Sequence, residues 1–488
     1  MQKDNSTFRK ENMEKGPKFG KRHVQAILLF TGVATELMTR ITLSLSIVAM
    51  TDSTASVNDK IPTYTWKDRD VILSSFYWGY LVLLVAAGQA AKQYGPKWIL
   101  FTALTVNSCA TALIPLAAAY LGSKGVMACR IMQGISQGGV YPSVHTMLGR
   151  WAPQNERGRM STFVYSGISI ASIVCLPVTG AICKSYLGWP VSLYLFGGCG
   201  FLWSILWLFF GHNSPATHPT ISTAERRYIE ESLAQAEETE VIPTPWKAIL
   251  SSPHVWALVI PTAGSGYAVI FLQNEMPTYL KTVMNYDVDA SGYLSSLTSV
   301  IGVVGIYIYG PLSDFLIEKR YLSRTNTRKF FEVYACYGSA ASLLVLAYLK
   351  RSQEHLAVYM IAVANVFGSG ILFGHSVNPI DLSPRFSGII VGLANSMSSI
   401  AALCAPLSVQ YIVTDQTNPL QWRIVFIIAA IGYVLPATAF ILFASAERQW
   451  WDDGAVKDST TNQARVKKIS TIEPEILRKF STSNTVQI

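Results

Sequence analysis

The sequence GPLSDFLIEKR, at residues 310–320, follows a long apolar stretch, and a related sequence, GQAAKQYGPK, follows another such stretch at residues 88–97. Each begins with glycine, which lets two helices approach closely, and each carries basic residues toward its end. The copies occupy equivalent positions in the two halves of the chain, which predicts an internal repeat. At the fifth position, Lys92 in the first copy stands in place of the acid Asp314 of the second.

The stretches around this repeat have the composition of a membrane protein. Of the 488 residues, 50% are hydrophobic and 14% are charged, whereas soluble domains carry about 25% charged residues. The apolar residues fall in blocks of about 20, a length that crosses roughly 30 Å of hydrocarbon as a helix. We therefore predict an all-α membrane protein with about twelve transmembrane helices in two halves of six. The expected helices are 24–50, 71–91, 98–120, 125–149, 160–183, 190–211, 254–275, 291–313, 330–349, 356–378, 386–411 and 423–445.

The spacing of these helices divides the chain into five regions. A polar N-terminal tail, residues 1–23, has no short apolar core followed by a cleavage site, so we expect no signal peptide. In the linker between the halves, Ser222 and Glu225 form a capping-box pattern, which predicts a short surface helix with a solvated charged face. The other regions are the first half 24–211, the cytoplasmic linker 212–252, the second half 253–446 and the cytoplasmic C-terminal tail 447–488.

Basic residues predict the orientation of the helices. If the N-terminal tail is cytoplasmic, the cytoplasmic segments hold 28 of the 39 Lys and Arg residues and the opposite segments hold nine. This bias follows the positive-inside rule, so we expect both termini to be cytoplasmic, in a plasma membrane or an intracellular vesicle membrane. The net charge of +9 is then a topology signal, and we expect the lipid bilayer, not nucleic acid, as a partner. On the cytoplasmic side, the repeated loops predict a gate formed by Gly88, Gly95, Lys97, Gly310, Asp314 and Arg320.

Two arginines, Arg40 and Arg130, remain inside the predicted helices. A charge in the bilayer interior costs several kcal/mol or more, so an intramembrane arginine is a candidate functional residue. At about 1.5 Å per residue, both lie roughly 8–10 Å below the outer surface, where two guanidiniums would bind a carboxylate or phosphate. The alternatives are that the arginines reach the surface or pair with acids. Glu36 lies one helical turn before Arg40 and is placed to neutralise it. Tyr77 and Tyr80 are candidates for shaping the cavity.

Other polar residues of the same half are candidates for coupling. Gln137 follows Arg130 by two helical turns and either donates to a substrate or packs. His145, nearer the cytoplasmic end, either carries a proton or forms a structural hydrogen bond. Glu36 is a third candidate, as a proton carrier. The sequence shows no nucleophile–base arrangement, phosphate loop or metal cluster, and its seven cysteines lack metal-type spacing, so we expect neither an enzyme nor a resident cofactor or metal.

Dispersed motifs cover nearly the whole membrane region, from about residue 24 to residue 451. They include RITLS at 40–44, SSFYWGY at 74–80, RIMQG at 130–134, YPSVH at 141–145, PTY at 277–279, GPLSD at 310–314 and SAERQW at 445–450. Together they resemble the animal anion–cation symporter family of the major facilitator superfamily. That family includes sodium–phosphate cotransporters, the lysosomal sialic-acid transporter and vesicular glutamate transporters.

The resemblance implies a transporter that moves an anion by alternating access, with Arg40 and Arg130 in anion recognition. Some positions depart from the family pattern. Gln137 stands where proton-linked members usually have glutamate, and Pro379 stands where a histidine is usual before a Leu-Asp pair. Phosphate-cotransporter-like members often have glutamine at the first of these positions. The chain most resembles the group described as inorganic phosphate cotransporters, many of them from insects.

We therefore expect secondary active transport of a small inorganic or organic anion, phosphate-like or carboxylate, by cation-coupled symport. Either sodium or a proton is the coupling ion, and the sequence does not choose between them. It also predicts neither the particular anion nor the oligomeric state. A non-transporting receptor or sensor on the same scaffold and an anion leak pathway are the alternatives. The repeated loop and the paired arginines favour the transporter.

Overall fold

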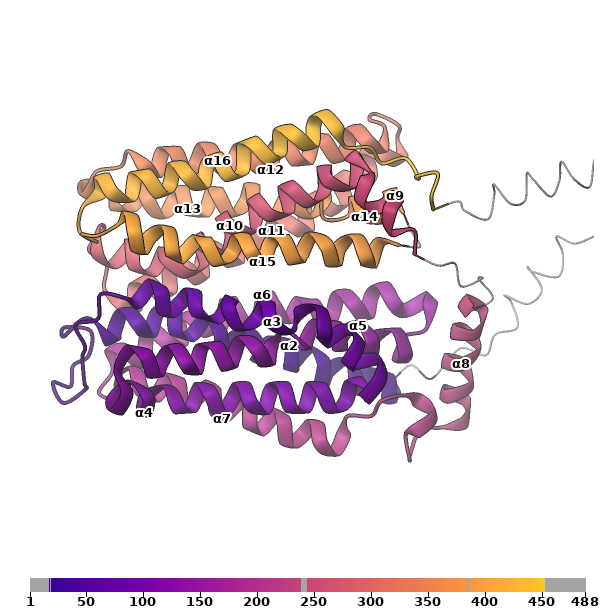
Figure 1. Cartoon of the computed structure of the whole chain (residues 1–488), viewed down its shortest axis with the longest axis horizontal. Helices are drawn as coiled ribbons and strands as arrows, with labels where there is room; N and C mark the ends of the chain where they lie inside the picture. The colour runs from indigo at the N-terminus through magenta and orange to yellow at the C-terminus, as the bar shows by residue number, and fades with distance from the viewer. Residues whose placement is uncertain (1–16, 18, 238–243, 384–385, 453–488) are drawn as a thin grey trace, which may run out of the picture.

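The computed structural model describes residue 17 and residues 19–237, 244–383 and 386–452. Most of the predicted N-terminal tail, and the predicted C-terminal tail beyond residue 452, lie outside the described residues. Within them, all of the regular secondary structure is helical, and Figure 1 shows two groups of long helices side by side. The predicted all-α architecture in two halves is confirmed.

The chain order of the elements follows the predicted repeat. The first group contains α2 (Lys21–Met50), α3 (Arg69–Tyr94), α4 (Pro96–Gln137), α5 (Val140–Trp151), α6 (Gln154–Lys184) and α7 (Gly188–Phe210). The connection contains η1 (Pro215–Thr217), α8 (Thr223–Glu237) and α9 (Trp246–Ser251). The second group contains α10 (Pro253–Thr282), α11 (Val288–Glu318), α12 (Arg324–Ala347), η2 (Arg351–Gln353), α13 (Glu354–Ser369), η3 (Gly370–Phe373), α14 (Asn378–Leu382), α15 (Ser387–Ile412) and α16 (Pro419–Phe443).

Ten stretches of the described chain are long and apolar enough to cross a membrane. One of them, Pro96–Trp151, covers two predicted helices, because the backbone leaves the helical conformation at Gly122, where φ is 62° and ψ is −151°. Glycine adopts such a left-handed φ at little cost, unlike most residues. Together with α3, a further helix of 26 residues, these stretches provide the predicted twelve crossings.

The two ends of the bundle carry different parts of the chain. At one end, named here the α8 end, Figure 1 shows α8 beside the ends of the long helices, and α2 begins and α16 ends there. At the opposite end, named the far end, lie the connections 51–68, 185–187, 283–287 and 413–418. Because each crossing runs between these two ends, the position of a residue along its helix gives its depth.

Two predicted helices are interrupted where glycines occur. The helix predicted at 125–149 breaks at Gly138 and Gly139, between α4 and α5. In place of one helix at 356–378, the structure has α13, which ends at Ser369. The short helix η3 follows from Gly370, and α14 comes after it. Glycine destabilises a helix interior by about 1 kcal/mol relative to alanine, which explains why these helices break at these positions.

The helices α3 and α4 touch backbone to backbone. A Cβ atom on Gly79 of α3 would collide with the carbonyl oxygen of Ile131 in α4. A Cβ atom on Gly134 of α4 would collide with the carbonyl oxygen of Phe76 in α3. Small residues allow such close crossings between membrane helices. The contact fixes Phe76 against α4.

Polar contacts between the two halves gather toward the far end. Three ion pairs join them: Lys184 Nζ lies 2.9 Å from Asp289 Oδ2 and 3.3 Å from Asp287 Oδ2, and Lys281 Nζ lies 2.9 Å from Asp52 Oδ2. The halves are therefore held together at the far end in this conformation. Three side chains also donate across the interface to backbone carbonyls, namely Ser296 to Ile173, Ser74 to Leu403 and Gln410 to Lys67.

We expect Gly134→Ala to lower the thermal unfolding temperature of the purified protein, because the added methyl group meets the Phe76 carbonyl and forces α3 and α4 apart. Overpacking of this kind costs about 1–3 kcal/mol. Gly198→Ala in α7 is the matched control, since its added Cβ has no heavy atom within 4 Å. The control should be unchanged or slightly more stable. Equal unfolding temperatures for the two variants would contradict the backbone contact.

Candidate functional site

Two guanidinium groups contact one aromatic ring in the first half. The Cζ atom of Arg40, on α2, lies 4.6 Å from the centroid of the Phe76 ring, on α3. The Cζ atom of Arg130, on α4, lies 5.0 Å from the same centroid. A cation over a ring face is stabilised by the ring quadrupole, by about 2 kcal/mol or more away from water. The ring therefore offsets part of the cost of holding two like charges close together.

Aromatic residues of α3 place this group where the two halves meet. The Nη2 atom of Arg40 donates to the Tyr77 hydroxyl at 2.7 Å. The Tyr80 ring stacks on Phe76 with centroids 5.8 Å apart. Phe76 and Tyr77 also pack against Ala402 of α15, in the second half. The structure thus brings together Arg40, Arg130, Tyr77 and Tyr80, the four residues named above as candidates for binding an anion.

Neutral groups hold the second arginine. Arg130 is 2% exposed, and its Nη1 atom donates to Gln133 Oε1 at 3.0 Å and to the backbone carbonyl of Arg40 at 3.3 Å. Gln133 is held in turn by donating to Thr111 at 2.7 Å. Within the described part of the chain, neither arginine forms an ion pair, and Arg130 Nε has no hydrogen-bond partner. Among the described residues, no carboxylate contacts either guanidinium directly, and the buried Glu36 acts on the charge of Arg40 from a greater distance.

Glu36 lies one turn before Arg40 on α2 and is fully buried. Tyr141 of α5 donates to its Oε2 atom at 3.2 Å, and its Oε1 atom has no partner among the described residues. The predicted alternative of an ion pair between Glu36 and Arg40 is not formed within 4 Å. Gln137 donates to the Glu36 backbone carbonyl at 3.2 Å and to Asn107 at 3.1 Å, so it ties α4 to α2.

The first copy of the repeated loop is bonded within its own half. Gly95 joins α3 to α4 with a φ of 85°. The Lys97 backbone N–H donates to Asn213 Oδ1 at 2.9 Å, and its Nζ atom donates to the Leu208 carbonyl at 3.0 Å. The loop is thereby attached to the end of α7. Gly88 lies in a part of α3 whose side-chain surroundings are not described.

The second copy lies beside a buried ion pair. A Cβ atom on Gly310 would be in ordinary contact with the Phe373 ring, at 3.5 Å. Asp314 and Arg320 of the predicted gate are exposed. The charged contact at this place joins α12 to α14, where Arg328 Nε donates to Asp381 Oδ2 at 2.7 Å. Arg328 also donates to the hydroxyl of Ser313 at 3.5 Å, so the repeated loop is attached to this ion pair.

Sequence reasoning did not identify a buried pair in the second half. His375 Nδ1 lies 2.9 Å from Glu332 Oε2, and the His375 backbone N–H donates to the same oxygen at 3.1 Å. The two residues are 43 positions apart, and no local spacing connects them. Phe76 was noted only as part of a family motif. The predicted coupling residue His145 lies beside Tyr165, with ring centroids 5.3 Å apart.

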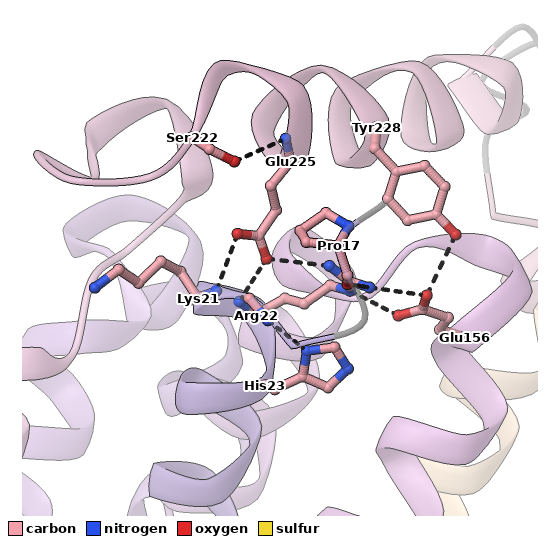
Figure 2. Close-up of polar contacts among 9 residues, drawn as sticks. Pro17, Lys21, Arg22, His23, Glu156, Ser222, Glu225 and Tyr228 are labelled. Atoms are coloured by element: carbon pink, nitrogen blue, oxygen red, sulfur yellow. Dashed lines mark hydrogen bonds and ion pairs between the residues drawn. The ribbon is translucent and has the colours of Figure 1, made fainter. Parts of the chain in front are cut away.

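At the α8 end, Arg22 joins α2 to α6 and α8 (Figure 2). Its Nε atom donates to Glu156 at 2.7 Å, and its Nη1 atom donates to Glu225 at 3.2 Å. Glu225 also accepts from the backbone N–H groups of Lys21 and Arg22, where the helix dipole favours a carboxylate. Burial and the Glu156 carboxylate raise the pKa of Tyr228, which donates to Glu156 at 3.3 Å. The linker helix forms as predicted, but Glu225 binds the bundle and does not face solvent.

We expect Arg22→Met to lower the unfolding temperature and to expose the linker to protease, because it leaves two carboxylates without their cation. Breaking a buried pair in this way costs about 3 kcal/mol. Arg226→Met is the matched control on α8, since Arg226 pairs with Glu230 at 2.8 Å with both side chains about half exposed. Such exposed pairs contribute about 0–1 kcal/mol. If the two variants unfold and are cleaved alike, Arg22 does not hold the linker.

Comparisons with known proteins agree with this architecture. The family model described as Major Facilitator Superfamily matches residues 29–406. A solved bacterial homolog of the human lysosomal transporter Spinster has a TM-score of 0.65 at 14% identity, covering 88% of this chain and 99% of that chain. A D-xylose-proton symporter has a TM-score of 0.63 at 15% identity, covering 87% of this chain and 98% of that chain. At these identities, the structures show the fold alone.

Relatives with higher sequence identity show to which group within the superfamily the chain belongs. A protein of Drosophila melanogaster named "Putative inorganic phosphate cotransporter" is 33% identical over 470 residues, which cover 91% of this chain and 89% of the relative. Vesicular glutamate transporter 3 of Danio rerio is 30% identical over 444 residues, which cover 89% of this chain and 74% of the relative. The chain is therefore a secondary transporter of the major facilitator superfamily and belongs to its group of animal anion–cation symporters.

Proposed function

We propose that the chain transports a small anion, phosphate-like or carboxylate, which Arg40 and Arg130 bind between the two halves. The observation that carries this proposal is the contact of both guanidiniums with Phe76, without an ion pair to either among the described residues. A guanidinium binds a carboxylate or phosphate through two parallel hydrogen bonds. Because an unpaired buried charge is costly, both arginines are stabilised when an anion neutralises them.

The neighbouring tyrosines suit the same ligand. The Tyr77 hydroxyl accepts a hydrogen bond from Arg40, and a phenol also donates one. We propose that Tyr77 donates to the anion and that Tyr80 forms a wall of the cavity. The names of the relatives support an anion, since phosphate and glutamate both carry negatively charged oxygens that match the fork of a guanidinium.

We propose that the α8 end is cytoplasmic, because the segments at that end carry most of the basic residues. The polar contacts between the halves lie toward the far end, so the anion would enter or leave this conformation from the cytoplasm. Alternating access then requires the far-end contacts to break as the halves close at the α8 end. The membrane would be a plasma membrane or that of an intracellular vesicle.

We propose that transport is coupled to a cation and that Glu36 is the candidate proton carrier. Glu36 is buried, and its Oε1 atom lacks a partner in the described part of the chain. Gln137, where proton-linked members usually have an acid, cannot titrate. It still orients the α2 backbone by donating to the Glu36 carbonyl. His145 is exposed and is the second candidate.

Arg40→Ala should lower anion uptake into proteoliposomes by about 10- to 100-fold below saturation, because a hydrogen bond to a charged group contributes about 1.5–3 kcal/mol. Uptake of labelled phosphate, urate, sialate and dicarboxylates under sodium and pH gradients measures this effect. Arg40→Lys keeps the charge without the planar fork, so its uptake should fall between that of the native chain and that of Arg40→Ala. Arg226→Ala, on the exposed face of α8, is the control and should transport like the native chain.

Each other outcome of this assay has a distinct meaning. Normal uptake by Arg40→Ala would remove Arg40 from the binding site. Gradient-dependent uptake of none of these anions by the native chain would favour a receptor or sensor. Uptake without saturable counterflow would favour an anion leak pathway.

Glu36→Gln should flatten the pH dependence of uptake across about pH 5 to 8, because the amide keeps the shape of the acid but binds no proton. Initial rates at several pH values, each with and without sodium, measure the change. Glu230→Gln, at an exposed site on α8, is the control and should keep the native profile. An unchanged profile for Glu36→Gln would show that Glu36 does not carry the proton.

A further inference from the structure

A buried acid lies where the halves are held together at the far end. Glu275, on α10, is 0% exposed, and neither carboxylate oxygen has a hydrogen-bond partner among the described residues. It lies about two turns before α10 ends at Thr282, so it is inside the closed far end. Buried polar groups are nearly always hydrogen-bonded, and an exception of this kind requires a physical explanation.

The Glu275 carboxylate interacts electrostatically with charged residues of the other half. Asp70 and Arg69, at the start of α3, both act on its charge and are themselves buried, at 2% and 4% exposure. Arg69 Nε donates to Asp70 Oδ1 at 3.2 Å, and Arg69 Nη2 has no partner in the described chain. Tyr267, on the same helix as Glu275, is the other titratable group near it, and its hydroxyl is bonded to Ser408 of α15 at 2.6 Å.

The charges in this cluster do not balance. Asp70 pairs with Arg69, so the cluster holds two buried carboxylates and one buried guanidinium. An unpaired buried charge costs several kcal/mol, and a neighbouring like charge adds to the cost. One bound proton removes the excess negative charge. Two acids that interact in this way take up that proton as a pair.

We propose that Glu275, together with Asp70, is a proton site that makes closure of the far end depend on pH. While the far end is open, water reaches both carboxylates and both ionise. Closure removes that water, so one carboxylate takes a proton from the solvent at the far end, forming an O–H bond, and returns it there on reopening. The inference rests on the proposed transport function only in that the far end must open and close.

The same cluster is poorly suited to a sodium ion. Arg69 brings a positive charge to the Asp70 carboxylate, where it would repel a metal cation. Hard cations take about six oxygen ligands. The described residues contain no group of three acidic, histidine or cysteine side chains able to hold a metal. A proton needs only one of the two carboxylates.

Spin labels on either side of the far end measure its closure directly. Lys60→Cys and Thr417→Cys place labels on exposed connections of the first and second halves, after Cys109, Cys199 and Cys404 are replaced. Distances from double electron–electron resonance in lipid nanodiscs then give the closed fraction at each pH. For the native site, the closing equilibrium should rise by up to about tenfold per unit fall in pH between about pH 8 and 6.

Two variants separate the proton from a structural effect. Glu275→Gln should keep the far end closed at every pH, because the amide fills the same space without charge. Asp70→Asn leaves Glu275 intact and free to pair with Arg69, so closure should lose most of its response to pH. The unfolding temperature of Glu275→Gln shows whether this variant folds. If it folds poorly, Asp70→Asn still tests the proposal.

Asp52→Asn is the matched control at the same end. Burial raises the pKa of Asp52, but hydrogen bonds from Lys281 and Thr54 outweigh it and hold the pKa below its ordinary range. The stabilisation from this ion pair is therefore present above the ordinary Asp pKa and is lost only at more acidic pH. The control should change the closed fraction equally at every pH and keep the native slope.

The assay contains no substrate, so it is independent of which anion is transported. A native response to pH that Glu275→Gln retains would overturn the proposal. So would a closed fraction that follows sodium concentration and not pH. A failure of anion uptake with the pH response intact would count against the proposed function and leave this proton site standing.

Discussion

The crossing of α3 and α4 at Gly79 and Gly134 is the contact on which the candidate site depends. Because neither helix has a side chain at the crossing, the backbones touch, and Phe76 is carried against Arg130. From α2, Arg40 reaches the same ring. An aromatic face stabilises a guanidinium without neutralising it, whereas a carboxylate would cancel its charge. The ring can therefore hold both cations in place while leaving their charge available to a ligand.

The two halves treat their buried charges differently. In the first half, Arg40 and Arg130 are held by a phenol, an amide and a backbone carbonyl. In the second half, Arg328 forms an ion pair with Asp381, and His375 contacts Glu332. Burying an unmatched ion is the more costly arrangement. Among the described residues, the guanidiniums without an ion pair lie in the first half, whereas the buried acid Glu275, which has no hydrogen-bond partner, lies in the second half.

The contacts at the two ends of the bundle also differ in kind. At the α8 end, Arg22 connects the linker to the first half through two carboxylates (Figure 2). At the far end, the ion pairs of Lys184 and Lys281 run between the halves. Partly exposed pairs of this sort contribute about 0–1 kcal/mol each, so they can break and re-form during transport. In the described part of the chain, the buried ion pairs of the linker thus lie at the α8 end, and the ion pairs between the halves lie at the far end.

The sequence alone determined the number of crossings, their division into two halves, and the presence of Arg40 and Arg130 in the interior. Apolar length and the placement of basic residues follow from the thickness and charge of a membrane, and both can be read along a single chain. Only the tertiary structure placed Phe76 against both arginines, turned Glu36 toward Tyr141, and left the acid at 275 without a hydrogen-bond partner among the described residues. These outcomes depend on how each helix is rotated about its axis and where it crosses its neighbours. Hydrophobic spacing does not record either quantity, because nearly every face of these helices is apolar.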